Sequence, residues 1–288
     1  MIRRISAALI VATALTLSAC GGDDSASTAN ESTESAATEN DCRTLNEGEL
    51  TIGTGSPAFS PWVENDAPES GEGFEAAVGL AVAAELGYEG ESVKWVRTTF
   101  DEAIAPGDKN FDFNMQQYSI TPEREETISF SDSYYSSNQA IVALTGSAAE
   151  GAASVADLAD VKFGAQSGTT SLTFINEVIK PSNEPFVYDD NAGAKAALEA
   201  GQIDAIVVDL PTALYISAVE IEGTAVVGQF PAAAGGIADN FGAVFTKDSP
   251  LVACVNTALA TLKESGELAK IEQAWLSDNA GVPVISVD

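Results

Sequence analysis

Histidine is absent from this chain of 288 residues. Without histidine, the chain cannot build Ser-His or Cys-His nucleophilic catalysis, and it lacks the commonest protein ligand for metal ions. A Gly-x-x-x-x-Gly-Lys-Ser/Thr phosphate-binding loop is missing as well. These classes of site are therefore excluded, and our expectation for the chain is no catalytic residue, no metal and no cofactor.

Basic residues are scarce: 13 Lys and Arg stand against 43 Asp and Glu, which gives a net charge of −30. Nucleic-acid-binding proteins neutralise phosphates with clustered basic side chains, and helices that lie on anionic lipid do the same. We therefore expect no nucleic-acid partner and no direct binding to a lipid surface. The acidity is read as a solvated surface, because charge balance informs solubility rather than fold.

The chain begins with a short apolar run, Ile5–Leu17, behind two arginines. Its 13 residues fall short of the ~20 that a spanning helix needs, and the pattern is that of a secretory signal. The stretch Leu17-Ser18-Ala19-Cys20 resembles the lipobox of bacterial lipoproteins, which implies cleavage before Cys20 and diacylation of its sulfur. We predict a lipoprotein signal peptide at 1–19 and a lipid anchor on the outer face of the cell membrane. An ordinary signal peptide with a coincidental cysteine is the alternative.

Two further cysteines, Cys42 and Cys254, are then left as a pair in an oxidising compartment. A disulfide between them is predicted, with two unpaired thiols as the alternative. Residues 21–41 contain no Lys or Arg and no aliphatic residue larger than alanine. Such a segment cannot bury a core, so 20–41 is predicted to be a lipid-anchored, disordered tether.

From Glu49 onward, short apolar strands alternate with helical segments, for example strand Leu50–Gly53, helix Phe74–Leu86 and a strand at Phe241–Phe245. This alternation predicts an α/β protein with open, mainly parallel sheets and helices on both faces. Roughly 240 folded residues are comfortable for two lobes.

Loops that follow expected strands carry the candidate binding residues, because ligands of open parallel sheets bind beyond the carboxyl ends of strands. The first loop, residues 55–62, holds Phe59 and Trp62 among Gly, Ser and Pro. The two rings can line a pocket for the apolar part of a ligand. Packing of both rings beneath the loop is the alternative.

The second loop leads into a short helix, with Thr121 as a good N-cap and Pro122 as a good first residue. Arg124 then lies in the first turn, where the helix dipole disfavours a cation, so it needs an anionic partner. The acidic residues at 123, 125 and 126 can supply that partner as a solvated surface pair.

The third loop, residues 166–171, joins a strand to a helix and contains Thr169 and Thr170 behind a glycine. Free backbone N–H groups and hydroxyls make a cradle for a carboxylate or phosphate, although an ordinary N-cap has the same sequence. Asp209 ends the apolar strand 205–208, and capping of the helix that follows is its alternative role.

These residues together match a free amino acid. Its carboxylate would bind Arg124 and a helix N-terminus, its ammonium would bind Asp209, and its side chain would enter an aromatic-lined pocket.

Several stretches recur in the order found in one family: Phe59-Ser-Pro-Trp62, Gly73-Phe74-Glu75, Ser119-Ile-Thr-Pro-Glu-Arg124, Phe130-Ser-Asp-Ser-Tyr134-Tyr135, Gly168-Thr169-Thr170 and Asp204-Ala-Ile-Val-Val-Asp209. From about Leu50 to Leu276 the chain resembles the polar amino acid-binding proteins of bacterial ABC importers. These are solute-binding proteins of family 3, relatives of the histidine-, lysine/arginine/ornithine- and glutamine-binding proteins.

The resemblance implies a two-lobed periplasmic-binding-protein-like fold with a two-strand hinge near Ser137–Ile141 and Pro231–Asp239. Lobe I would comprise 42–138 and 235–288, and lobe II 139–234. The implied function is capture of a free amino acid by hinge closure and delivery to the permease subunits of an ABC importer. We expect a monomer that is not an enzyme.

The resemblance also assigns roles to the candidate residues. The α-carboxylate would be held by Arg124, Ser119, Thr169 and Thr170. The α-ammonium would be held by Asp209 and the backbone around Gln117. The ligand side chain would pack on Phe59 and Trp62.

Two other classes of function fit the same fold. One resembles the periplasmic cyclohexadienyl dehydratases, which act on prephenate- or arogenate-like acids and need a general acid, here Glu75 or Asp209. The other is a sensory amino-acid-binding module that would signal through a separate receptor.

Overall fold

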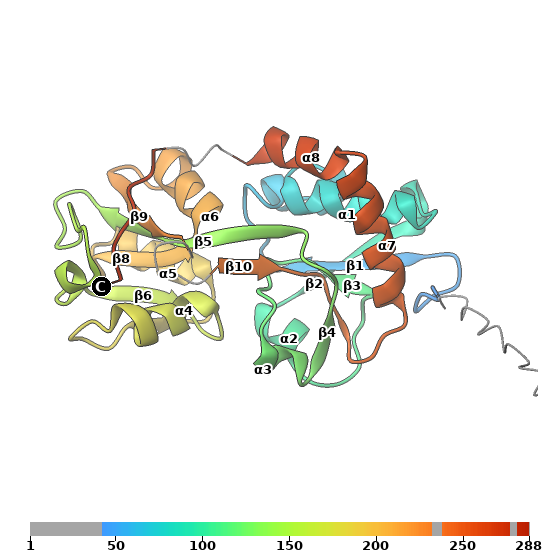
Figure 1. Ribbon diagram of the computed structural model, residues 1–288, viewed down its shortest axis with the longest axis horizontal. Coiled ribbons are helices and arrows are strands. Elements are labelled where there is room, and N and C mark those ends of the chain that lie inside the picture. The colour runs from blue at the N-terminus through green and yellow to red at the C-terminus, as the bar shows by residue number, and fades with distance from the viewer. Residues whose placement is uncertain (1–41, 232–237, 277–280, 288) are drawn as a thin grey trace, which may run out of the picture. The chain divides into compact units, whose positions relative to one another are not determined.

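The computed structural model describes residues 42–231, 238–276 and 281–287. The predicted signal peptide, Cys20 and the tether therefore lie outside the described residues, as does most of the second predicted crossing, Pro231–Asp239. Two sheets with their helices form two lobes within this part of the chain (Figure 1).

The sheet of lobe I has five strands in the order β2-β1-β3-β11-β4. Their bounds are Leu50–Gly55 for β1, Val93–Thr98 for β2, Phe113–Asn114 for β3, Ile128–Phe130 for β4 and Val244–Thr246 for β11. Strand β1 runs parallel to β2 and β3, whereas β11 runs antiparallel to β3 and β4. Every residue of β1 is buried, as expected for a central strand with both faces covered.

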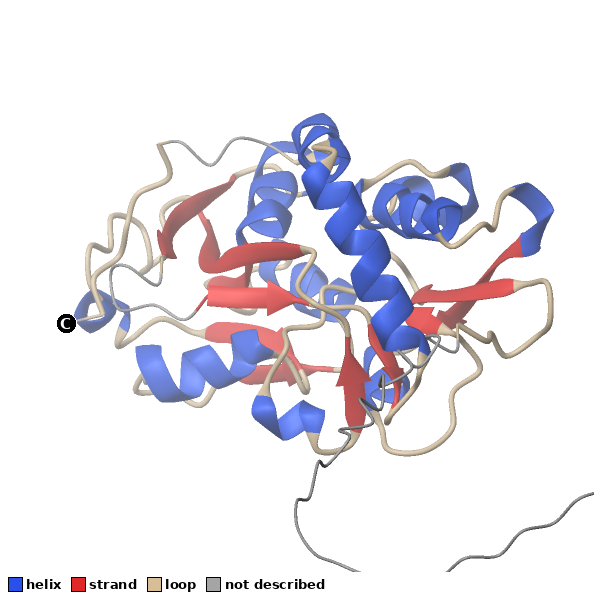
Figure 2. Cartoon of the chain, turned by 45° about the vertical axis from the view of Figure 1, so that its right-hand side comes forward, coloured by secondary structure: helices blue, strands red, loops and turns tan. Residues whose placement is uncertain are grey.

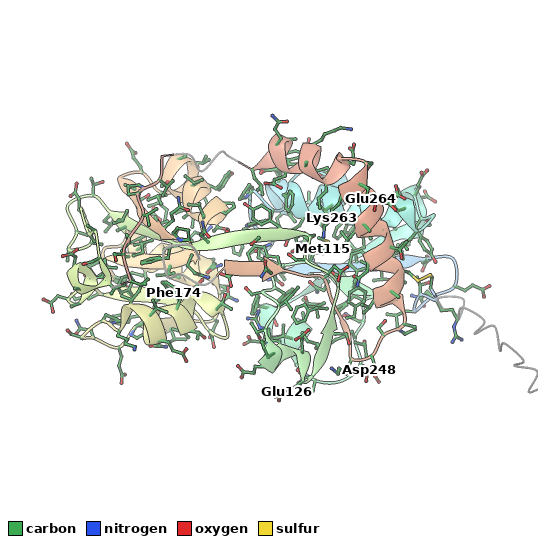
Figure 3. The ribbon with its side chains drawn as sticks, viewed as in Figure 1. Met115, Glu126, Phe174, Asp248, Lys263 and Glu264 are labelled. Atoms are coloured by element: carbon green, nitrogen blue, oxygen red, sulfur yellow. A yellow bond between two sulfur atoms is a disulfide. The ribbon has the colours of Figure 1, made fainter. Side chains whose placement is uncertain are left out.

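Helices cover both faces of this sheet. One face carries α1, α7 and α8, which span Phe74–Glu85, Leu251–Glu264 and Glu267–Trp275. Their apolar side chains form one core with the strands, in which Met115 is 2% exposed (Figure 3). The other face is covered by α2, Phe100–Ile104, and by the region of α3, Pro122–Glu125. Helix α2 begins at Thr99, whose side chain forms a reciprocal capping box with Glu102.

The sheet of lobe II has the order β10-β5-β8-β6-β7, and β9 pairs with β5. The bounds are Tyr135–Leu144 for β5, Phe163–Gln166 for β6, Phe186–Tyr188 for β7, Ala205–Asp209 for β8, Thr224–Phe230 for β9 and Ala238–Phe241 for β10. Only the β6–β7 and β6–β8 pairings are parallel among the ladders of this sheet that the described residues form. Both sheets are thus mixed rather than mainly parallel, because the strands that connect the lobes enter them antiparallel.

Helices also cover both faces of the second sheet (Figure 2). Helix α4, Thr170–Phe174, continues as a wider turn over Ile175–Ile179 and packs on one face, where Phe174 lies in the core (Figure 3). The other face carries α5, Asn191–Glu199, and α6, Leu210–Tyr215. Helices α5 and α6 each begin at an aspartate N-cap, Asp190 and Asp209.

Strand β5 connects the lobes (Figure 1). Its first part, 135–138, pairs with β10, and its second part, 139–144, pairs with β8 and β9 of lobe II.

The single strand expected at Phe241–Phe245 is instead divided between β10 and β11. The division falls at Gly242, where a Cβ would approach the Ile120 side chain to 2.9 Å and the Ser131 carbonyl to 3.1 Å. At this point the chain leaves the sheet of lobe II, which contains β10, and enters the sheet of lobe I, which contains β11.

The predicted disulfide is confirmed: Cys42 is bonded to Cys254 of α7, with their Cα atoms 5.8 Å apart (Figure 3). Cys254 belongs to the core of lobe I. The bond therefore fixes the first described residue to a helix 212 positions further along the chain.

The C-terminal segment 281–287 packs on lobe II, which differs from the expected assignment of 235–288 to lobe I. Ile285 is fully buried in the core beneath α4. Its N–H donates to the Gln229 carbonyl of β9, the Gln229 N–H donates to the Pro283 carbonyl, and the Ser286 N–H donates to the Ala153 carbonyl. Gly228 makes room for it, since a Cβ there would lie 2.6 Å from the Ile285 side chain. A long-range contact of this kind has no local sequence signal.

Among the described helices, none is long and apolar enough to cross a membrane.

Candidate functional site

A cavity lies where the carboxyl ends of strands from both sheets meet. Its volume is about 50 Å³. One water molecule needs roughly 10–15 Å³, so the cavity can hold more than a single water. Lobe I contributes residues that follow β1 and β3, and lobe II contributes residues that follow β6, β7 and β8. The lining side chains are Phe59, Phe100, Gln116, Gln117, Ser119, Arg124, Gln139, Gln166, Thr169, Thr170, Ser171, Asn191, Val208, Asp209, Asp239 and Phe241.

Arg124 faces this cavity from α3. Its guanidinium donates to the carbonyls of Ser119, at 2.8 Å, and Gly168, at 2.9 Å, and lies over the Phe100 ring. Within the part of the chain that the structure describes, no carboxylate lies within 4.0 Å of it, so its acidic sequence neighbours do not pair with it. Burial lowers the pKa of Arg124 below its usual value. A half-buried cation of this kind requires an anion to complete its environment.

The hydroxyls predicted to accompany Arg124 lie beside it. Thr169 caps α4 by accepting from the Leu172 N–H at 3.2 Å, so the expected N-cap is also a cavity residue. The hydroxyls of Ser119 and Thr170 are 3.2 Å apart and join lobe I to lobe II. The cation and these hydroxyls lie together at one end of the cavity, a set of donors that suits an anion.

Asp209 lines the cavity and also caps α6. One carboxylate oxygen accepts from the Thr212 N–H at 2.9 Å and the other from the Thr212 hydroxyl at 2.8 Å. Burial raises the pKa of Asp209 to about 6, against the opposing effect of these two hydrogen bonds. Asp209 thus caps α6, the alternative role considered for it, and also lines the cavity, where a cation would favour its ionised form.

Gln117 is held in a left-handed backbone conformation, with φ of 51°. Glu75, only 1% exposed, accepts from the Gln117 N–H at 2.8 Å and also from the Gln117 amide and the Tyr134 hydroxyl. Burial raises the pKa of Glu75 to about 7. Because Glu75 lies behind Gln117, the carboxyl positions the loop rather than facing the cavity.

The two aromatic candidates of the first loop have different positions. Phe59 lines the cavity as predicted, whereas Trp62 is 1% exposed in the core of lobe I, against Phe74 and Phe241. The expected contact of Trp62 with a ligand is therefore not what the structure shows. The Trp62 indole instead donates to the Thr212 hydroxyl at 2.8 Å, which in turn donates to Asp209.

Sequence reasoning missed several lining residues, chief among them Asp239, Gln139, Gln116 and Asn191. Asp239, 4% exposed, accepts from the Gln139 side chain where β10 and β5 run together. Asn191 comes directly after the cap of α5, a position whose sequence did not indicate a cavity.

Across residues 42–231, 238–276 and 281–287, Cys, Asp and Glu form no group of three suited to a metal ion.

The fold and the site are those of a two-lobed solute-binding protein. Residues 50–278 match the bacterial extracellular solute-binding proteins, family 3, and the chain belongs to that family. The arginine-binding periplasmic protein of Mannheimia haemolytica is 30% identical over 225 residues, covering 76% of this chain and 88% of the relative.

Solved structures agree with this assignment. An ancestral arginine-binding protein bound to glutamine superposes with a TM-score of 0.66 at 29% identity, covering 81% of this chain and 100% of that one. The ancestral amino acid-binding protein AncCDT-1, a precursor of cyclohexadienyl dehydratase, has a TM-score of 0.66 at 30% identity, with 80% and 96% covered. The predicted resemblance and two-lobed fold are confirmed.

Proposed function

We propose that this chain is an extracytoplasmic solute-binding protein that captures a free amino acid between its lobes and delivers it to an ABC importer. The observation that carries the proposal is that one small cavity holds a cation, Arg124, and a carboxylate, Asp209, neither of which forms a salt bridge among the described residues. A zwitterion carries the two opposite charges that such a cavity lacks.

The α-carboxylate of the ligand would bind the Arg124 guanidinium, with the hydroxyls of Ser119 and Thr170 and the backbone N–H groups of Thr169 and Thr170 around it; the Thr169 hydroxyl itself donates to the Gln166 carbonyl. The α-ammonium would bind Asp209. The N–H and the side-chain NH2 of Gln117 donate to Glu75, so the Gln117 oxygens are the atoms that would accept from the ammonium. Phe59 would cover the aliphatic stem of the ligand.

Closure would follow from contacts that join the lobes. The Trp62 indole bonds to Thr212, and the Arg124 guanidinium bonds to the Gly168 carbonyl, so each lobe supplies part of one site. A ligand that bridges Arg124 and Asp209 stabilises this arrangement by the contacts that only the closed state makes. Strands β5 and β10 would act as the hinge.

Lipid attachment through Cys20, a monomeric state and delivery to permease subunits complete the proposal. They rest on the sequence of residues 17–20 and on membership of the family. An enzymatic role as a dehydratase is not favoured, since Glu75 lies behind Gln117 and Asp209 is held by Thr212. Incubation with prephenate, followed by product detection, tests that alternative directly.

A thermal-shift panel of all free amino acids on the full-length protein tests the main proposal. Ligand at 100 times its dissociation constant stabilises by about 2.7 kcal/mol, or roughly 5–10 °C for a domain of this size. Arg124→Ala should abolish the shift while the protein remains folded. Lys270→Ala removes a cation from an exposed ion pair on α8 and serves as the matched control. A flat panel on folded protein would reject the proposal.

A further inference from the structure

We infer that Trp62 is a positioning residue for ligand binding: through the Thr212 hydroxyl, its indole holds the Asp209 carboxylate in the orientation that accepts the α-ammonium. Trp62 does not line the cavity, and it acts from the core of lobe I on a carboxylate of lobe II. The inference rests on the proposed function, in which Asp209 binds the ammonium. It adds a residue that controls affinity without touching the amino acid.

The hydrogen bonds between these three residues run in one direction. An indole nitrogen carries a single N–H and no acceptor, so Trp62 can only donate, and it donates to the Thr212 hydroxyl at 2.8 Å. The Thr212 oxygen therefore accepts on this side, and its one proton is left to bond the Asp209 carboxylate at 2.8 Å. Trp62 thereby fixes a hydroxyl that otherwise rotates to suit any neighbouring acceptor.

The hydroxyl bond is the second of two that Thr212 gives to Asp209. The first comes from the Thr212 N–H, which bonds the other carboxylate oxygen at 2.9 Å as the N-cap bond of α6. With one bond alone the carboxylate can turn about its terminal torsion, which has a broad minimum, whereas two bonds to two oxygens select one orientation. A carboxylate has about four acceptor sites, so these two bonds leave capacity for an ammonium.

Trp62 donates from a fixed place. The residue is 1% exposed, and its ring meets Phe74, Tyr135 and Phe241 edge-on, with centroids 5.8, 5.8 and 5.6 Å away. Tyr135 begins β5 and Phe241 ends β10, the two strands of the proposed hinge. The orientation of Asp209 therefore depends on where the core of lobe I lies relative to lobe II.

The packing of Trp62 and its hydrogen bond can be separated by experiment. The ring packs in the core of lobe I, whereas the N–H bonds to Thr212 of lobe II. Phenylalanine at position 62 keeps much of the ring contact and removes the donor. A purely structural role predicts a lower free energy of unfolding with unchanged affinity, whereas a positioning role predicts a loss of affinity that depends on Thr212.

Calorimetric titration of the full-length protein tests the inference. The probes are L-glutamine, L-arginine and any other free amino acid that raises the melting temperature in the thermal-shift panel. Trp62→Phe should weaken binding about three- to tenfold, and Thr212→Val, which removes the hydroxyl, about tenfold or more. Thr212→Ser keeps the hydroxyl and should bind like the natural protein. Trp95→Phe makes the same change in β2, the edge strand of lobe I, and should leave affinity unchanged.

A double variant decides whether Trp62 acts through Thr212. In a Thr212→Val background, Trp62→Phe should cause no further loss of affinity, because the hydroxyl that the indole orients is already gone. Loss by the same factor in both backgrounds, or natural affinity in folded Trp62→Phe, would overturn the inference.

The pH profile of affinity shows whether the effect reaches Asp209. The bond from the Thr212 hydroxyl favours the ionised carboxylate and lowers the pKa of Asp209. Affinity should therefore begin to fall at a higher pH in Thr212→Val than in the natural protein, and Trp62→Phe should show part of the same shift. A structural role of Trp62 would leave the profile where it is, and that result contradicts the inference.

The other titratable groups that face Asp209 are kept in these variants. They are Asp239 of β10, Glu75 of α1 and the phenols of Tyr134 and Tyr135, where β5 begins. Because the natural protein and the variants share them, a difference between the profiles reports the hydroxyl bond.

If Trp62→Phe does not fold, the indole of the natural residue still tests the inference. Its N–H resonance, assigned against those of Trp95 and Trp275, should shift in Asp209→Asn, because the Thr212 hydroxyl transmits the loss of charge. A resonance that does not move would refute the link between Trp62 and Asp209.

The outcomes separate this inference from the proposed function. If no free amino acid binds the folded protein, the proposed function fails and the inference fails with it. If an amino acid binds, Arg124→Ala abolishes that binding and Trp62→Phe binds as tightly as the natural protein, the proposed function stands and only the inference fails.

Discussion

Ligand affinity should weaken as the pH falls from 7 to 5, because Asp209 must be ionised to hold an ammonium. Its pKa in the ligand-free protein is raised to about 6 by burial. A bound ammonium favours the carboxylate and returns the pKa toward the ordinary value near 4. Between these two pKa values each pH unit costs a factor of about ten in affinity. The dissociation constant should therefore rise about tenfold from pH 7 to pH 5.

The absence of histidine makes this measurement unusually direct, since no imidazole titrates in the same interval. Titration calorimetry with an uncharged-side-chain ligand such as glutamine, in buffers of different ionisation enthalpy, would report both the affinity and the protons released. In Asp209→Asn the affinity should be low at pH 7 and nearly constant down to pH 5. A natural protein with the same affinity at both values would refute the role assigned to Asp209. A slope that persists in Asp209→Asn would instead identify Glu75, whose pKa is about 7.

Other perturbations test the fold around the site. Because burial raises the pKa of Glu75 to about 7, the folded protein keeps a proton that the unfolded chain loses as the pH rises. The free energy of unfolding of the ligand-free protein should therefore decline by up to ~3 kcal/mol from pH 4.5 to 7. In denaturant titrations, Glu75→Gln should show a smaller change over this interval. Replacing Cys42 and Cys254 with serine should cost ~2–4 kcal/mol of stability yet leave ligand affinity unchanged, since both lie in lobe I. Ile285→Ala should cost ~2–4 kcal/mol by opening a cavity in lobe II, and a two-step melting curve would show which lobe is affected.

The sequence predicted those parts of the site that are encoded within short stretches. Arg124 lies in the first turn of a helix capped by Thr121, and Asp209 directly ends its strand, so capping rules and strand ends singled them out as candidates, whereas Ser119 was indicated by the family resemblance. Thr169 was recognisable in the same way, because the signal for an N-cap is local.

The remaining parts depend on contacts between distant segments. Asp239 and Gln139 are brought together only by the pairing of β5 with β10, and no local pattern reports that pairing. Trp62 occupies the core because Phe74 and Phe241 surround it. The packing of Ile285 on lobe II likewise depends on Gly228, more than 50 positions earlier in the chain.

The disulfide also determines which lobe bears a mechanical load. Any pull on the residues before Cys42 passes through the sulfur bridge into α7 and the core of lobe I. That route avoids β5 and β10, so tension at the N-terminal side does not act on the hinge.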